Sequence, residues 1–341
     1  MRLLSARPRV ALAIAATYVA FGAPLAAAQH GRDATGHPPG DHGHASAPAD
    51  GPQTKLSALA QRQISAVLSA LEPFRDPKAA VAAGYRKPDS DTPTMGAHWV
   101  NGDLVRDGRI DLRKPEILMY ADIGGKPTLV GVSYLTPSPK GAAFPEGFDG
   151  PNDAWHRHDP GEASSFAAAG RQRNGAARAA AGGRGARGAG MGIAMSHFWV
   201  IDAVGGPFTD HNHWLPFVSS GLPHPGDDIS RQHPIVVAEA SLALAAWRQT
   251  STIMKRAAEA VRGADASVLK GHLSTIAALA PDYAAHRSAA KDDESIDHLN
   301  RLAQEWRAIR EIFLRNVPAK QKAILTQAFD NMTRGHPHGH M

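Results

Sequence analysis

The sequence predicts an α+β fold, in which a small antiparallel β-core with irregular loops is flanked by an N-terminal helix and a C-terminal helical region. Apolar residues recur at helical spacing over 54–72 and through most of 234–331. Between these segments lie β-rich runs at 117–120, 128–134 and 196–201, and two glycines separate the first two runs as in a hairpin. The 33 glycines and 25 prolines favour long irregular connections.

Residues 1–28 have the pattern of a secretory signal peptide. Arg2, Arg7 and Arg9 form a basic start, an apolar stretch follows, and three alanines precede Gln29. An uncleaved membrane anchor is the alternative interpretation of this segment. Removing it leaves 34 basic and 32 acidic residues, so the net charge falls from +5 to +2. We therefore expect a periplasmic or secreted protein, with no nucleic-acid partner and no stable membrane insertion after cleavage.

The rest of the chain divides by composition. Residues 29–53 and 334–341 are His-rich tails without apolar periodicity, for which we expect disorder. A core domain is expected over 54–232, interrupted by a low-complexity insertion of Ala, Gly and Arg at 167–192, and a helical region over 233–333. The tail histidines are either loose ligands for Cu or Zn or incidental residues of solvated segments.

Proline and glycine positions predict how the helical region is divided. We expect one helix over 235–262, a second over 266–280, and a third that begins at Pro281. A fourth helix is predicted over 296–313, and Pro318 opens the last one.

Histidine lies beside tryptophan, or one residue away from it, at four places: 98–99, 155–158, 197–199 and 211–214. The chain has no cysteine, so any metal ligands must come from His, Asp and Glu. Imidazole is the commonest neutral metal ligand, and indole rings provide rigid, partly dry surroundings. The pattern indicates a metal site or a polar histidine pocket in the middle of the chain.

The strongest local signal is the pair His156 and His158. On a strand, a spacing of two residues places both imidazoles on one face. We predict a metal site formed by this pair with His98 and His197, and with Glu116 as a candidate carboxylate ligand. Three or four nitrogen and oxygen ligands without sulfur suit Zn or Cu(II), and Fe is a further option. Each histidine taken singly also fits a core or turn residue that is satisfied by hydrogen bonds.

A second His-x-His pair follows an acidic residue, in the segment from Asp210 through His211 and His213 to Trp214. It either completes the same site, covers its mouth, or forms a solvated loop. In the helical region, His286 and His298 flank the acidic run 292–294. A surface pair of Glu294 with His298, four residues apart on a helix, is a simpler interpretation than a carboxylate-bridged metal in a helix bundle.

The spacing Gly-x5-His-x-His-x3-Glu, which ends at Glu162, resembles the first metal-binding motif of the cupin β-barrels. This resemblance implies that His156, His158 and Glu162 bind a metal together with a later histidine such as His197. The chain departs from the cupin pattern at 159–161, where Asp-Pro-Gly ends the strand, and no second cupin motif is evident.

A longer resemblance covers about 74–217. The segments MGAHWVN at 95–101, PEILMY at 115–120 and WHRH at 155–158 are similar to segments of a group of uncharacterised exported bacterial proteins. The resemblance implies one domain built around these His and Trp positions, with a shorter link in place of 167–192. The group has no established activity that could be carried over.

The sequence therefore predicts an exported metal-binding protein for Cu or Zn, to which the His-rich tails contribute. A metal-dependent enzyme is the first alternative, either an oxygenase or a metal-assisted hydrolase with Glu116 or Glu162 as base. The second alternative is a structural or interaction protein without metal, whose histidines satisfy a polar core.

Overall fold

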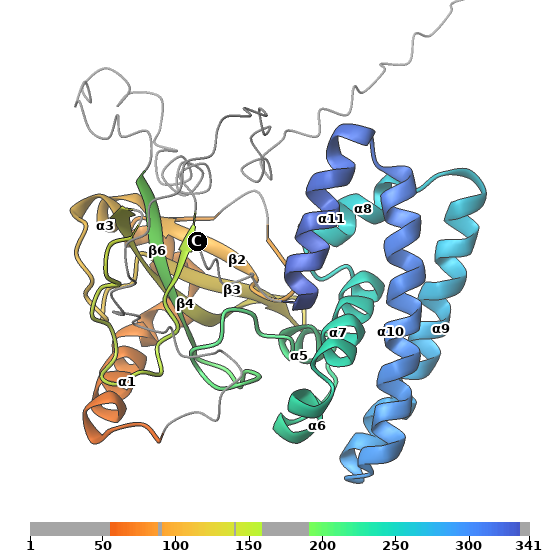
Figure 1. Ribbon diagram of the computed structural model, residues 1–341, viewed down its shortest axis with the longest axis horizontal. Coiled ribbons are helices and arrows are strands. Elements are labelled where there is room, and N and C mark those ends of the chain that lie inside the picture. The colour runs from red at the N-terminus through yellow and green to blue at the C-terminus, as the bar shows by residue number, and fades with distance from the viewer. Residues whose placement is uncertain (1–54, 88–90, 140, 159–190, 335–341) are drawn as a thin grey trace, which may run out of the picture.

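A computed structural model describes residues 55–87, 91–139, 141–158 and 191–334. The predicted α+β class is confirmed: a six-stranded antiparallel sheet lies between a short N-terminal helical segment and a C-terminal helical region (Figure 1). The predictions for 1–28 and 29–53, and nearly all of those for 167–192 and 334–341, lie outside the described residues. Within the described ranges, no helix combines the length and apolar character that crossing a bilayer requires.

The sheet has the strand order β1-β2-β3-β4-β6-β5, so β6 lies between β4 and the short β5. The strands are β1 (Tyr85–Arg86), β2 (Ala97–Asn101), β3 (Ile117–Ile123), β4 (Lys126–Pro139), β5 (His156–His158) and β6 (Met191–Trp199). The predicted hairpin is formed by β3 and β4, which turn at Gly124 and Gly125. Both glycines have positive φ, the backbone region that other residues rarely adopt.

The helices before and between the strands are α1 (Ala58–Leu71), the 3₁₀ helix η1 (Glu72–Arg75), α2 (Pro77–Ala82) and α3 (Gly102–Asp107). Ser57 begins α1, because its hydroxyl accepts a hydrogen bond from the backbone N–H of Ala60. Val67 and Leu71 of α1 then pack with Leu118 and Val132 of the sheet. This apolar cluster closes one face of the sheet, which we call the helix-covered face.

The C-terminal helices are α5 (Leu215–Ser219), α6 (Asp227–Gln232), α7 (Pro234–Arg248), α8 (Thr252–Ala260), α9 (Gly263–Ser288), α10 (Asp292–Asn316) and α11 (Ala319–Arg334). They enclose a separate apolar core, in which residues of α7 meet Leu302, Trp306 and Phe313 of α10. The short α5 contacts both β3 and α7, so it joins the sheet to the helical region (Figure 1).

Two helix predictions are wrong. The segment 235–262 forms two helices, because Gln249 adopts a left-handed conformation and the hydroxyl of Ser251 caps α8 through the N–H of Met254. Conversely, Pro281 lies inside the continuous helix α9 instead of starting a new one. Proline removes one backbone hydrogen bond from α9. The helix continues, because the buried Tyr283 packs in the apolar core and its hydroxyl donates a hydrogen bond to the backbone carbonyl of Pro223. The predicted helices at 296–313 and after Pro318 are confirmed as α10 and α11.

We predict that Gly96→Ala lowers the free energy of unfolding by well over roughly 1–2 kcal/mol, which is the usual cost of an alanine in the left-handed backbone conformation. Gly96 has a φ of 72°, and a Cβ there would lie 2.5 Å from the backbone oxygen of Tyr120. Gly108 has a similar φ of 66° with no atom within 4 Å of such a Cβ, so Gly108→Ala is the matched control. Urea unfolding measures both, and equal losses would contradict a steric role for Gly96.

Candidate metal centre

The register of the sheet places His98 and His197 on the same face. His98 in β2 lies opposite Met119, Met119 lies opposite Gly131, and Gly131 lies opposite Trp199. Residues directly opposite each other on neighbouring strands point to the same face, and so do residues two apart on one strand. His197, two residues before Trp199, therefore shares its face with His98.

The short strand β5 adds two more imidazoles to this face. His156 lies opposite Met195 and His158 lies opposite Ile193, both on β6, and Met195 is two residues from His197. Arg157 lies between the two histidines on the exposed side of the strand. All four predicted histidines thus share the face opposite the helix-covered face, and we call it the histidine face.

The histidine face is concave. In a flat sheet, β2 and β6 would be about 14 Å apart, because two strands lie between them. The ring centroids of His98 and His197 are nevertheless only 6.0 Å apart. A β-bulge between Met119 and Tyr120 bends β3, and Gly131 in the next strand leaves room for the side chain of Met119. The curvature brings residues from distant strands to one point.

The segment after β6 closes over this point. The backbone N–H of Asn212 donates to the carbonyl of Thr94 at 2.9 Å, and the hydroxyl of Thr94 pairs with Nδ1 of His211, also at 2.9 Å. Asp210, His211 and Asn212 are all buried. Of the alternatives that the sequence leaves open for this segment, the solvated loop is excluded, and Asp210 joins the histidines.

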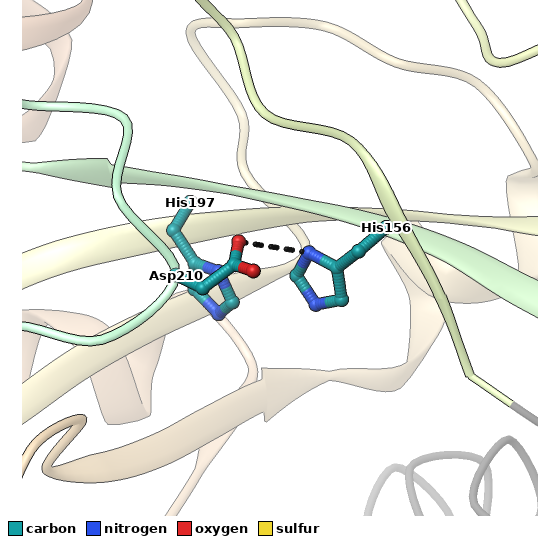
Figure 2. Close-up of side chains that lie close together, drawn as sticks. All are labelled: His156, His197 and Asp210. Atoms are coloured by element: carbon teal, nitrogen blue, oxygen red, sulfur yellow. Dashed lines mark ion pairs between the residues drawn. The ribbon is translucent and has the colours of Figure 1, made fainter. Parts of the chain in front are cut away.

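His156, His197 and Asp210 form a buried group whose ligand atoms all lie within 4.8 Å of one another (Figure 2). The exposed fractions of the three residues are 6%, 0% and 7%. Nδ1 of His156 lies 3.1 Å from Oδ1 of Asp210, and the rings of His156 and His197 are stacked with centroids 5.2 Å apart. On the other side of its ring, Nε2 of His156 lies 3.0 Å from Nε2 of His158.

His197 is the least satisfied polar residue of the group. Neither Nδ1 nor Nε2 of its ring has a hydrogen-bond partner within the described parts of the chain. A buried polar group without a partner costs about 1–3 kcal/mol of stability, so such atoms are rare unless they serve a bound species. Both nitrogens of this fully buried imidazole are therefore available to a bound species.

Burial sets the charges of the group. It lowers the pKa of His98 to about 4, with the neighbouring His158 contributing, and it lowers the pKa of His197 well below its usual value. Burial alone would raise the pKa of Asp210, but the contact with His156 and the nearby His197 and His211 hold it below its usual range. At neutral pH, His98 and His197 are therefore neutral and Asp210 is ionised, which are the forms that bind metals.

The structure does not bring Glu116 into this group. The residue precedes β3, and its Oε2 accepts a hydrogen bond from the backbone N–H of Leu135 at 3.0 Å. Burial raises the pKa values of Tyr85 and Tyr134, and the carboxyl of Glu116 adds to both shifts. Both tyrosines belong to the helix-covered face. Asp210 supplies the carboxylate instead. The signal for Asp210 in the sequence was its position directly before a His-x-His pair and Trp214. Asp159 and Glu162 lie outside the described residues.

The group offers two imidazole nitrogens and one carboxylate oxygen, with His98, His158 and His211 close by. Such a set without sulfur can hold Zn, Cu(II) or non-haem Fe. Comparisons of the chain with protein-family models, with curated proteins and with solved structures found no match in any of the three. The function of the group therefore has to be argued from its own chemistry.

We predict that Glu116→Gln removes the loss of stability that the wild type undergoes when Glu116 loses its proton at rising pH. Burial raises the pKa of Glu116 from 4.5 to about 8, so the folded chain holds this proton more tightly than the unfolded chain. The stabilisation is complete below pH 4.5 and is lost as pH rises through about 8, with a slope of at most about 1.4 kcal/mol per pH unit. Glutamine keeps the acceptor for Leu135 but does not titrate.

Urea unfolding between pH 5 and 9 checks this prediction. The variant should gain stability relative to the wild type as pH rises across that range. The exposed Glu72 provides the control, since Glu72→Gln should leave the shape of the pH profile unchanged. Parallel profiles for wild type and Glu116→Gln would contradict the buried, protonated carboxyl.

Proposed function

We propose that this chain is an exported metal-binding protein that holds a divalent transition metal, zinc or copper, through His156, His197 and Asp210. The single observation that carries the proposal is the fully buried His197, whose two ring nitrogens both lack a hydrogen-bond partner among the described residues. A metal ion bound at one of these nitrogens would supply the missing partner. The other members of the group are already in place around the ring.

The charge of the group supports a cation. Asp210 is ionised and buried, and burial keeps the neighbouring His197 uncharged. Arg157, the closest basic residue along the chain, points elsewhere: its guanidinium contacts Ser138 and the carbonyl of Pro139, and lies 4.5 Å from the centre of the Phe144 ring. The buried Asp210 contacts His156, and a divalent ion would add a counter-charge for this carboxylate.

The distances between the ligand atoms of the group would suit a bound zinc ion after a small contraction of the group. Ligand atoms around a zinc ion at about 2.0–2.2 Å lie roughly 3.0–3.6 Å from one another. Nδ1 of His156 and Oδ1 of Asp210 are already 3.1 Å apart, and the largest separation in the group is within 4.8 Å. A shift of about 1 Å in one side chain would complete the coordination.

The ligand set also favours a second candidate function, a metal-dependent enzyme. Two histidines and one carboxylate leave coordination positions open, and this set serves both hydrolytic zinc and non-haem iron in oxygenases. The third alternative, a structural protein without metal, leaves both nitrogens of His197 without a partner.

Export and metal capture by the tails complete the proposal. The signal-like residues 1–28 support a periplasmic or secreted location, as does the resemblance of 74–217 to exported bacterial proteins. The seven tail histidines would then collect Zn or Cu at low affinity and raise its concentration near the buried group.

We predict that His197→Leu abolishes metal-dependent stabilisation without lowering the stability of the metal-free protein. Replacing a buried, unbonded imidazole by an apolar side chain is neutral or stabilising when no metal is bound. With Zn at about a hundred times its Kd, the wild type should gain about 2.7 kcal/mol, which is roughly 5 °C or more in Tm. Thermal unfolding with and without Zn measures this, because Tm responds only to ions that prefer the folded state.

His298→Leu is the matched control for this experiment. His298 is also buried, and its Nδ1 also lacks a hydrogen-bond partner among the described residues, but it lies in α10 within the separate helical core. This variant should keep the full rise of Tm with Zn. A wild type whose Tm does not respond to Zn or Cu would contradict the proposed function.

We further predict that the first 28 residues direct export and are removed. The full chain made in a bacterial host should appear in the periplasm or medium with Gln29 as its first residue, as read by N-terminal sequencing. Ala28→Phe should block cleavage at that point, because the site requires a small residue there. A full-length, intracellular product would contradict export.

A further inference from the structure

We propose that the centre holds two metal ions, bridged by the imidazole of His156. One ion would bind Nδ1 of His156 together with His197 and Asp210. The second would bind Nε2 of His156 together with His158 and His98. This inference rests on the proposed function, because it assigns the number of ions and the ligands of the same centre.

The two nitrogens of His156 face two different ligands at nearly equal distances. Nδ1 lies 3.1 Å from Oδ1 of Asp210, and Nε2 lies 3.0 Å from Nε2 of His158. Adjacent ligand atoms of one ion, at about 2.1 Å from it and at right angles, are about 3.0 Å apart. Each contact therefore has the separation of two ligands on a shared ion. Figure 2 shows that one nitrogen of His156 faces Asp210 and that the second nitrogen points away from this contact.

A single-ion centre is the alternative, with Asp210 serving only to orient His156 by accepting a hydrogen bond from Nδ1. The geometry argues against this arrangement. A carboxylate that only orients His156 needs a contact with that ring alone. Asp210 also forms one compact group with His197, whose nitrogens lie within ligand reach of the same carboxylate. Asp210 is thus placed as a ligand on the Nδ1 side.

The Nε2 side has its own donors. His158 is buried and its ring centroid lies 4.8 Å from that of His156. His98 extends from β2 on the same face, its ring centroid lies 6.0 Å from that of His197, and its pKa is lowered by burial and in part by His158 and His156. Three imidazole nitrogens without a carboxylate suit Cu or Zn better than Mg or Ca, which prefer oxygen.

The bridge has a defined proton balance. A neutral imidazole carries one N–H proton and one lone pair, so it can bind one ion without losing a proton. Binding a second ion at the other nitrogen releases the N–H proton to solvent and leaves an imidazolate with one negative charge. This charge, with that of Asp210, offsets part of the charge of the two buried ions.

Metal analysis of the full chain tests the number of ions. To remove binding by the tails, the protein carries glutamine in place of the seven tail histidines: His30, His37, His42, His44, His336, His338 and His340. After loading with Zn and gel filtration, we expect two ions per chain. His158→Gln and His98→Gln should each retain one ion, and this ion shows that the variant is folded. His286→Gln, which changes a histidine paired with Glu294 in the helical region, should retain two.

Copper provides a second readout. Two Cu(II) ions joined by an imidazolate are magnetically coupled, so the intensity of the EPR signal should fall well below the total copper content. In His158→Gln, the signal should account for all the copper that remains. One Zn per chain, or two ions that persist in His158→Gln, would overturn the inference while the proposed function stands. No bound ion at all would overturn both.

Discussion

Burial of polar rings on the concave histidine face is the constraint on which the surrounding structure depends. His197 lies in β6, at 0% exposure, with neither ring nitrogen hydrogen-bonded within the described chain. Each unbonded nitrogen costs about 1–3 kcal/mol, so the fold must supply a partner from somewhere. The elements around it bring Asp210 and three further histidines close to this ring, although none of them hydrogen-bonds to it within the described residues.

The rest of the fold holds that point in place. The bulge in β3 and the absence of a side chain at Gly131 let the sheet curve, and the curvature brings β2 within reach of β6. The turn at Gly96 carries Thr94, which binds the segment after β6 through His211 and Asn212. The helix-covered face and the helical region supply the apolar cores that keep this polar group rigid.

Much of the fold followed from local patterns, and so did the candidate histidines. Alternating β-rich runs with two glycines between them predict the β3–β4 hairpin, and helical spacing predicts α1 and α10. The strands that carry His98, His156 and His158 were harder to predict, because β2 has five residues and β5 has three. Such short strands are defined by their partners more than by their own residues. The break at Gln249, in contrast, has a local signal, because Ser251 is a typical helix N-cap residue and caps α8.

The sequence by itself determined the class of fold, the absence of thiolate ligands, and a spacing that places His156 and His158 on one side of any strand. Only the tertiary structure decided which carboxylate accompanies them. The strand register places Glu116 on the opposite side of the sheet, where it accepts a hydrogen bond from the backbone N–H of Leu135. Asp210 lies in the connection after β6, which brings its carboxylate to His156 and His197. Side-chain direction within a strand is a local property of the backbone. The meeting of β2, β5, β6 and a loop depends on pairing and curvature summed over the whole sheet.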